Sequence, residues 1–503
     1  MRGFPSSVTD IRKKVFTEVA RLAYDGDYDR MEDLPYVIVP GEEAMYRESI
    51  FLERAIAGER VRLAMGLPLR PVDQRVLVSE GLSESAIAEK YYEPPLINII
   101  NYACHACPTR QYRITEYCQG CLAQSCRQVC PKDAIRFVNG KCYIRQDACI
   151  KCGKCAAACN YNAIIQLDRP CARACGMDAI GSDEHGRAKI DYDKCVSCGM
   201  CLVNCPFGAI VDKGQIFQLI NAILQGDKVV AIVAPAFLGQ FGPDATPERL
   251  TAAMKRLGFA GVAEVAVGAD LCTIEEAKDF MEKVPAEQPF MATSCCPSWS
   301  VMAKKLFPQF ADYISMALTP MVLTARLQKQ KDPGCRIAFI GPCAAKKLEA
   351  SRRTIRSDVD FVLTFEELQG MFEAKGVGFA SIPPEEEVPL SEATGAGRGF
   401  AVTGGVAGAV VKAIERMEPG REVKVASAEG LKECRKMLLL AKAGKYDGYL
   451  LEGMACPGGC VAGAGTIAPV DKSIAAIGRY SKAADKQNAL DSEYEVDLPL
   501  LDE

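Results

Sequence analysis

Cysteine is the residue type with the greatest capacity for chemistry in this sequence, because its thiolate binds metals and its thiol carries protons. The chain has 503 residues, with 25 cysteines but only two histidines, His105 and His185. In a reducing cytoplasm so many cysteines rarely form disulfides, so metal ligation is the leading explanation. Repeated C-x-x-C-x-x-C-x-x-x-C runs indicate iron–sulfur clusters, whereas zinc, the first rival, uses isolated C-x-x-C pairs. The scarcity of histidine assigns proton transfer to thiols, carboxylates or hydroxyls.

Seventeen cysteines lie between residues 98 and 212, and sixteen of them form pairs of two spacings. The C-x-x-C pairs are Cys104/Cys107, Cys118/Cys121, Cys149/Cys152 and Cys195/Cys198, and the C-x-x-x-C pairs are Cys126/Cys130, Cys155/Cys159, Cys171/Cys175 and Cys201/Cys205. In the ferredoxin motif three cysteines hold one cubane and the fourth crosses to its neighbour. Residues 149–159 and 195–205 match this motif fully, and 118–130 has two extra residues before its third cysteine.

The crossing rule predicts four ligand sets, each for one 4Fe–4S cluster. They are set 1 (Cys118, Cys121, Cys126, Cys159), set 2 (Cys149, Cys152, Cys155, Cys130), set 3 (Cys195, Cys198, Cys201, Cys175) and set 4 (Cys104, Cys107, Cys171, Cys205). Set 4 is inferred from the remaining pairs rather than from a continuous run. The alternative for any of these cysteines is a buried small hydrophobe, which we favour for Cys142, Cys272, Cys335 and Cys434. We interpret His105 as a bystander.

From residue 213 onward the sequence alternates between apolar runs and helical patterns. Residues 228–235, 289–296, 336–343 and 446–456 each run from an apolar strand candidate into a small-residue loop, and 273–284 and 406–417 are typical of helices. This alternation predicts an α/β domain of mostly parallel sheets flanked by helices. Ligand sites in such sheets lie at the carboxyl ends of strands. Three of the four loops end in cysteine, so we expect them to converge on one metal site.

Three regions follow from these patterns. Residues 1–97 contain no cysteine, and Val8, Ile11, Val15, Val19 and Leu22 recur at helical spacing, as do apolar residues over 42–66, so we predict a helical N-terminal region that packs against the rest. Residues 98–212 form one or more ferredoxin-like α+β iron–sulfur domains. Residues 213–503 form the catalytic domain, with a short peripheral tail after about 470.

The overall composition excludes several kinds of partner. A formal net charge of -4 predicts no general attraction to nucleic acid or acidic membranes, although it leaves room for local charged patches. No apolar run is long enough to cross a bilayer, and the first residues lack a secretory or twin-arginine signal. We therefore expect a cytoplasmic protein. Residues 403–410 (TGGVAGAV) lack the lysine of a phosphate-binding loop, so we expect no nucleotide site.

Three segments of the second half resemble the signature segments of FeFe-hydrogenases, in the family's order. They are TSCCPSW at 293–299, GPCAAKKLE at 341–349 and EGMACPGGC at 452–460. The resemblance, which covers roughly residues 98 to 470, implies that Cys296, Cys343, Cys456 and Cys460 hold a 4Fe–4S cube. It also implies that Cys460 bridges the cube to a diiron unit carrying CO, cyanide and an azadithiolate, the composite called the H-cluster.

The same resemblance assigns residues around the diiron unit. Lys346 matches a lysine that contacts a cyanide, whereas the neighbouring Lys347 fits a solvated surface lysine better. Pro235 and Ala236 match the cyanide-facing loop, where many relatives have serine in place of Ala236. Phe400 and Met454 match residues lining the pocket, although both could equally be plain core. Gly341 replaces a common methionine, which should leave that wall looser or differently filled.

A proton relay is also implied by the resemblance. Cys295 matches the thiol that exchanges protons with the bridging amine, and the relay continues through Glu276, Ser315 and Asp279. Glu276 and Asp279 stand three residues apart in a helical stretch and therefore share a face. Asp279 is one methylene shorter than the glutamate usual in the family. The alternative for this pair is an exposed helix face.

The activity implied is the reversible reduction of protons to hydrogen under anaerobic conditions. Electrons would come from ferredoxin or a similar soluble carrier through the four cubanes, with set 3 nearest the H-cluster, and maturation enzymes would supply the diiron unit. Residues 459–469 depart from the usual GGGQP ending, which indicates a divergent, monomeric, less-studied branch. The alternatives are a cytosolic iron–sulfur assembly factor with a hydrogenase-like domain and a hydrogen sensor.

Overall fold

Two parallel sheets form the centre of the second half of the chain in the computed structural model, which describes residues 3–87, 93–352, 355, 358–390 and 393–501. The first sheet has the order β10-β9-β12-β13, with β9 Val229–Val233, β10 Gly261–Glu264, β12 Arg336–Gly341 and β13 Phe361–Thr364. The second has the order β11-β15-β14, with β11 Phe290–Ala292, β14 Lys424–Glu429 and β15 Tyr449–Met454. All neighbouring strands are parallel, which confirms the predicted α/β fold.

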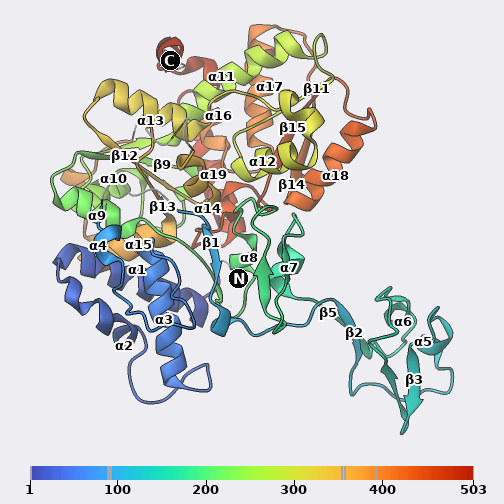
Figure 1. The fold of residues 1–503 in the computed structure, drawn as a ribbon. Helices are drawn as coiled ribbons and strands as arrows, with labels where there is room; N and C mark the ends of the chain where they lie inside the picture. Colours follow the sequence, from blue (N-terminus) through green and yellow to red (C-terminus); the bar gives the residue numbers. More distant parts are fainter. Residues whose placement is uncertain (1–2, 88–92, 353–354, 356–357, 391–392, 502–503) are drawn as a thin grey trace.

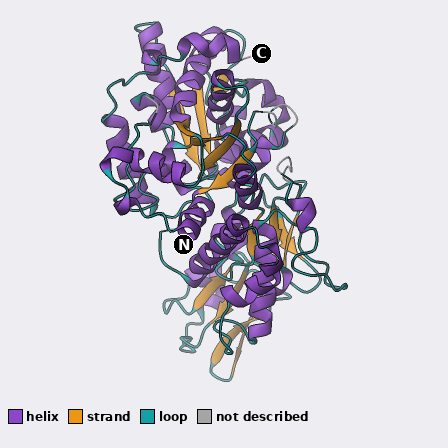
Figure 2. Cartoon of the chain, turned by 90° about the vertical axis from the view of Figure 1, so that its left-hand side faces the viewer, coloured by secondary structure: helices purple, strands orange, loops and turns teal. Residues whose placement is uncertain are grey.

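Helices surround these sheets (Figures 1 and 2). In chain order they are α9 Ile216–Leu224, α10 Pro247–Arg256, α11 Val265–Lys283, α12 Pro297–Leu306, α13 Pro320–Lys331, α14 Ala344–Ala350, α15 Phe365–Lys375, α16 Gly395–Gly399, α17 Gly405–Met417, α18 Leu431–Lys442, α19 Val470–Lys482 and α20 Leu498–Leu501. All four predicted strand segments form strands, and the two predicted helical segments lie in α11 and α17. Strand β9 reads VVAIV, is rich in β-branched residues and is buried throughout, as expected of a strand covered on both faces.

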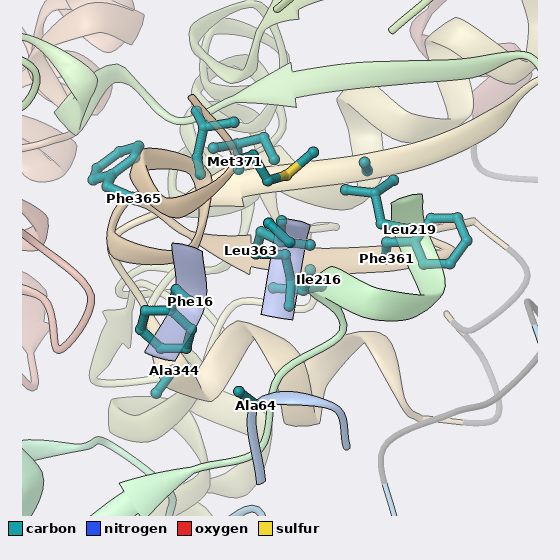
Figure 3. Close-up of a cluster of buried hydrophobic side chains, with 14 of the residues drawn as sticks. Phe16, Ala64, Ile216, Leu219, Ala344, Phe361, Leu363, Phe365 and Met371 are labelled. Atoms are coloured by element: carbon teal, nitrogen blue, oxygen red, sulfur yellow. The ribbon is translucent and has the colours of Figure 1, made fainter. Parts of the chain in front are cut away.

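The N-terminal region is helical, with α1 Ser7–Asp25, α2 Leu34–Ile38, α3 Ile50–Ala64 and α4 Leu82–Ser85. Only 50–64 of the helical pattern over 42–66 forms a helix. Residues 45–47 cannot continue it, because their backbone N–H groups all donate to the Glu53 carboxylate. Figure 3 shows Phe16 of α1 and Ala64 of α3 in one core with Leu363 of β13 and Phe365 of α15. The N-terminal region is thus part of the same hydrophobic core as the sheet.

The cysteine-rich region is divided into two bodies. One body is closed by β1 Ile97–Ile99, which pairs antiparallel with β8 Ile210–Asp212, and it includes α7 Pro170–Ala174, β6 Ile180–Ser182, β7 Ala188–Ile190 and α8 Met200–Val203. The other, which we call the lobe, comprises residues 108–168, with β2 Gln111–Ile114, α5 Ser125–Gln128, β3 Ile135–Val138, β4 Lys141–Ile144, α6 Lys154–Ala157 and β5 Ile164–Leu167. The lobe lies apart from the rest of the molecule (Figure 1).

The C-terminal segment is not peripheral, so that prediction is wrong. Helix α19 packs against α16, and Ile477 and Leu501 are buried. A polar stretch between these apolar side chains hid their periodicity. Among the described helices, none is long and apolar enough to cross a membrane.

Candidate metal centre

Four strand ends meet at one cavity of about 80 Å³, which we call the central cavity. β9 leads into Pro235 and Ala236, β11 into Cys295 and Cys296, β12 into Cys343, and β15 into the loop that carries Cys460. The chain brings together nine residues predicted for the site, and all nine line this cavity: Pro235, Ala236, Cys295, Cys296, Cys343, Lys346, Phe400, Met454 and Cys460. Cys456, the remaining predicted ligand, lies outside this lining on the loop after β15.

Local sequence explains how two of these cysteines are positioned. Cys296 and Cys343 each occupy the N-cap position of a helix, α12 and α14 respectively. Pro297 follows Cys296 at the first helical position, where its missing N–H is not needed and its fixed φ suits the helix. Each cysteine therefore sits at the junction of a buried strand and a helix, which holds its side chain at the mouth of the central cavity.

Thiol chemistry in this cavity fits a metal cluster. Burial raises the pKa of Cys343 to about 11 and that of Cys460 to about 12. Such thiols become thiolates when a metal compensates their charge, and soft thiolates are the ligands of iron–sulfur clusters. Within the described residues no three His, Cys, Asp or Glu side chains converge tightly enough to hold a single metal ion. The donors instead lie around a space, as the corners of a cluster require.

Lys346 is the cation of the central cavity. Its Nζ lies 2.7 Å from Glu349 Oε2, and Thr319 donates to the other oxygen of Glu349 at 2.7 Å. Burial alone would lower the pKa of Lys346, but the Glu349 carboxylate raises it, so the ammonium is retained. A buried cation beside thiol ligands suits an anionic ligand of a metal group.

Lys347 is not a solvated surface lysine, and that prediction is wrong. Its side chain is 0% exposed, and its Nζ lies 2.8 Å from Asp212 Oδ2 and 3.0 Å from Glu367 Oε1. The reason is its place on α14, one position after Lys346, which turns it toward β8 and α15. Sequence alone does not reveal which of two adjacent lysines faces which neighbour.

Phe339 fills the wall beside Gly341. A Cβ on residue 341 would lie 2.4 Å from Cε1 of Phe339, so the Phe339 ring can occupy its position only because residue 341 is glycine. Both residues are on β12, two apart and therefore on the same face, and Phe339 lines the central cavity. The wall is thus differently filled rather than looser. Sequence reasoning missed Phe339 and Glu349. The two-residue spacing from Gly341 on a strand could have revealed Phe339, and the three-residue spacing from Lys346 on a helix could have revealed Glu349.

Glu276 is buried rather than on an exposed helix face. Burial raises its pKa to about 7, although the Ser294 N–H, which donates to its Oε1 at 3.3 Å, and the nearby Ser315 side chain act in the opposite direction. Burial and then the Glu276 carboxylate raise the pKa of Cys295. Asp279 lies one turn further along α11, 30% exposed and 3.0 Å from Lys283 Nζ. Of the four predicted relay residues, Cys295 thus lines the central cavity, Glu276 and Ser315 are buried, and Asp279 is partly exposed.

The structure also brings together the members of the cysteine sets. Three small cavities are lined by all four members of set 2, of set 3 and of set 4, respectively. Three members of set 1, Cys118, Cys126 and Cys159, lie in one apolar cluster of the lobe, and Cys121 is a neighbour of Cys126, whose Sγ lies 3.9 Å from that of Cys142. Cys142, Cys272, Cys335 and Cys434 are all buried.

Set 3 lies next to the central cavity. Cys198 and Cys296 belong to one packed cluster, and the Ser298 hydroxyl of α12 donates to the Val196 carbonyl at 3.1 Å. Gly199, in the same loop, packs against Ala344 at the start of α14. The loop of set 3 therefore contacts the first turns of both helices that begin at predicted ligands.

Comparison with known proteins identifies the family. The family model described as the iron only hydrogenase large subunit, C-terminal domain, matches residues 227–464, and a 4Fe-4S binding domain matches residues 187–210. The periplasmic Fe hydrogenase large subunit of Nitratidesulfovibrio vulgaris is 31% identical over 287 residues, covering 47% of this chain and 68% of that protein. The chain belongs to the iron-only hydrogenase family.

The similar proteins include both hydrogenases and cytosolic iron–sulfur cluster assembly factors. Iron hydrogenase 1 of Clostridium pasteurianum is 28% identical over 450 residues, 77% of each protein. Hydrogenase relatives are matched over 53 to 77% of their own length, at low identity, which agrees with a divergent member of the family. The probable cytosolic Fe-S cluster assembly factor of Aedes aegypti is 28% identical over 278 residues, covering 45% of this chain and 58% of that protein.

Proposed function

We propose that this protein is an FeFe-hydrogenase that interconverts two protons and two electrons with hydrogen at an H-cluster in the central cavity. The observation that carries the proposal is that Cys295 and Lys346 face this cavity together with Cys296, Cys343 and Cys460. A cube needs only ligands. A free thiol and a buried ammonium beside it suit a site that also moves protons and holds an anionic group.

Each residue of the cavity then has a task. Cys296, Cys343, Cys456 and Cys460 would hold the cube, and Cys460 would also reach the diiron unit. When bound, the H-cluster supplies the redox chemistry that joins protons and electrons. Lys346 holds a positive charge toward it, and Ala236 offers backbone N–H without a side-chain donor. Phe400, Met454 and Phe339 close the cavity with apolar side chains and exclude water.

Proton delivery is assigned to the chain's own side chains. The Cys295 thiol gives a proton inward and is reprotonated by Glu276, which exchanges through the Ser315 hydroxyl. Asp279, at the exposed end, exchanges with water. A carboxyl group whose pKa lies near the working pH donates and accepts protons at little cost, which makes Glu276 the pivot of this relay.

Electron delivery is assigned to the four sets, as 4Fe–4S clusters, with sets 1 and 2 in the lobe and set 3 against the central cavity. The lobe contains nine lysine and arginine residues against four acidic residues, whereas the whole chain has a net charge of -4. This contrast favours an acidic soluble carrier such as a ferredoxin. We further propose a cytoplasmic protein whose diiron unit comes from maturation enzymes.

A second function, iron–sulfur cluster assembly, is favoured by the similarity to cytosolic assembly factors. It would use the cysteine sets and the cube ligands but would need neither the Cys295 thiol nor the relay. The two functions therefore differ in whether Cys295 matters.

The test is to produce the chain anaerobically with the family's maturation enzymes and to measure hydrogen evolution and infrared spectra. We expect CO and cyanide bands, and we expect Cys295→Ala to keep them while losing about 100-fold or more of the activity. Cys335→Ala, a buried cysteine outside the cavity, is the matched control. Iron present only as cubanes, with no such bands, would instead support the assembly function.

A further inference from the structure

Buried arginines surround set 4. Arg169, 4% exposed, donates from Nε and Nη2 to the Cys107 carbonyl at 3.1 and 3.0 Å. Arg60 of α3, also 4% exposed, donates from Nη2 to the Gly208 carbonyl at 3.0 Å. Arg47 donates to the carbonyls of Ala103 and Phe207 at 3.0 and 3.2 Å, at either side of the set.

The contacts of Arg47 and Arg60 reach the cavity that set 4 lines. The Arg47 guanidinium lies 5.8 Å from the ring of Phe207, and Phe207 stacks on His105 at 4.5 Å. Both rings line this cavity with the four cysteines. Gly208 has a φ of +57°, and a Cβ there would lie 2.9 Å from Arg60 Nη2, so the guanidinium lies directly against the backbone of the turn after Cys205.

In the described part of the chain, none of these three arginines has a carboxylate oxygen within 4.0 Å of a guanidinium nitrogen. Arg60 Nη1 is buried and makes no hydrogen bond there. Burial lowers the pKa of Arg60, the Tyr46 hydroxyl beside it raises the pKa, and the neighbouring Arg12 and Arg47 act in the same direction as burial. Glu53, two turns earlier on α3, is engaged by backbone N–H groups. A buried cation without an anion is strongly unfavourable, so the arrangement requires a negative charge.

We propose that the anion is the cluster held by set 4, and that Arg60, Arg47 and Arg169 raise its reduction potential above those of sets 1 and 2. This inference rests on the proposed function only in taking set 4 as a cluster site. Four thiolates give a cluster net negative charge, and reduction adds one more electron, so fixed cations nearby stabilise the reduced form. Charges on the lobe are solvated and screened, and act less.

The proposal gives the N-terminal region a role. Two of the three cations come from residues 47 and 60, which reach set 4 from outside the cysteine-rich region. Set 4 lies between the lobe, which begins directly after Cys107, and set 3, whose ligand Cys175 follows Cys171 by one helical turn. An electron passing from the lobe to the central cavity would therefore meet a cluster of higher reduction potential than those of sets 1 and 2 before it reached set 3.

The experiment is a redox titration followed by electron paramagnetic resonance on the full chain with its clusters reconstituted anaerobically. Cys171→Ser identifies the signal of set 4 as the one it removes or alters. Arg60→Met should lower the midpoint potential of that signal and leave the midpoint potentials of the other signals unchanged. Arg60→Lys, which keeps the positive charge, should have a midpoint potential close to that of the parent. Arg54→Met is the matched control, because Arg54 is on the same helix but donates to Val39 and Gly41.

An unchanged midpoint in folded Arg60→Met protein with all clusters present overturns the inference. Should that variant fail to fold, the half-buried Arg47→Met must shift the same signal in the same direction, and no shift there overturns it equally. A Cys171→Ser protein that keeps every cluster signal removes the cluster assignment of set 4. None of these outcomes depends on hydrogen turnover, which is measured separately with a dye as electron donor.

Discussion

At the scale of single residues, the site depends on how burial changes acidity. Glu276 is enclosed by α11 and the loop after β11, and this enclosure brings the pKa of its carboxyl group to about 7. The same enclosure keeps Cys295 protonated as a thiol. A thiol that holds its proton and a carboxyl group that exchanges it form a donor pair that needs no histidine.

We predict that Glu276→Gln lowers hydrogen evolution by about 100-fold or more, because an amide cannot pass a proton on. In the parent protein, the rate of hydrogen evolution should fall as the pH rises through about 7, since the Glu276 carboxyl group of the folded protein then loses the proton that it donates. Rates measured with a dye as electron donor check both points. Glu282→Gln, on an exposed position of the same helix, should have parental activity. Full activity in the Glu276→Gln variant would contradict the assignment of Glu276 to the proton relay.

At the scale of elements, α14 links the central cavity to the rest of the chain. It begins at Cys343, directs Lys346 to the cavity and buries Lys347 against Asp212 of β8 and Glu367 of α15. Arg12 of α1 completes the network with Glu366 at 2.7 Å and Asp212 at 3.4 Å. Burial would raise the pKa of Asp212, but Lys347 and then Arg12 lower it. Four elements from three regions are thus held by one set of charges.

We predict that Lys347→Met lowers the free energy of unfolding by about 3–5 kcal/mol, because Glu367 then remains buried without its cation and Asp212 keeps only the more distant Arg12. Urea denaturation of the cluster-free and reconstituted proteins measures this change. Lys436→Met, which removes an exposed ion pair of α18, should leave stability unchanged. Equal stability of the two variants would show that solvent compensates the buried carboxylates.

At the scale of the whole molecule, the lobe is set apart in both position and charge. No helix or strand of the lobe packs extensively against the remainder of the described chain. Its basic surface carries exposed apolar side chains beside the cysteine loops, such as Leu122 at 99% exposure and Ile150. Basic groups steer an acidic partner, and apolar groups give the contact once it arrives.

We predict that the triple change Lys132→Glu, Lys151→Glu and Lys154→Glu slows reduction of the clusters by an acidic ferredoxin by at least about tenfold at low salt. The effect should shrink as the salt concentration rises. Stopped-flow absorbance measures this step without any hydrogen chemistry. The same charge reversal at Lys436, Lys442 and Lys445, in and just after α18, should have little effect on the rate. An equal loss of rate there would show that the effect depends only on the net charge of the protein.

Much of this architecture follows from sequence pattern because it depends on local periodicity and spacing. The strands that lead to Cys296 and Cys343 and the helices that contain Glu276 and Phe16 are all of this kind. The cysteine sets also follow, since the motif is a short loop with a fixed geometry. What could not be predicted depends on tertiary neighbours. The burial of Lys347 depends on Asp212 and Glu367, and the irregular chain at 45–47 depends on the Glu53 side chain, which accepts three backbone N–H groups.

Set 4 was the least regular set because its motif is interrupted. β2 and β5 pair antiparallel, with Gln111 opposite Leu167, so the lobe leaves the body after Cys107 and returns to it just before Arg169, which binds the Cys107 carbonyl. If residues 108–168 were excised, Cys107 would join Arg169 and the sequence would read CHACRPCARAC. That is an unbroken C-x-x-C-x-x-C-x-x-x-C run. In sequence, the lobe is therefore an insertion at one peptide link of a run that has the spacing of the ferredoxin motif, and residues 195–205 carry a second such run.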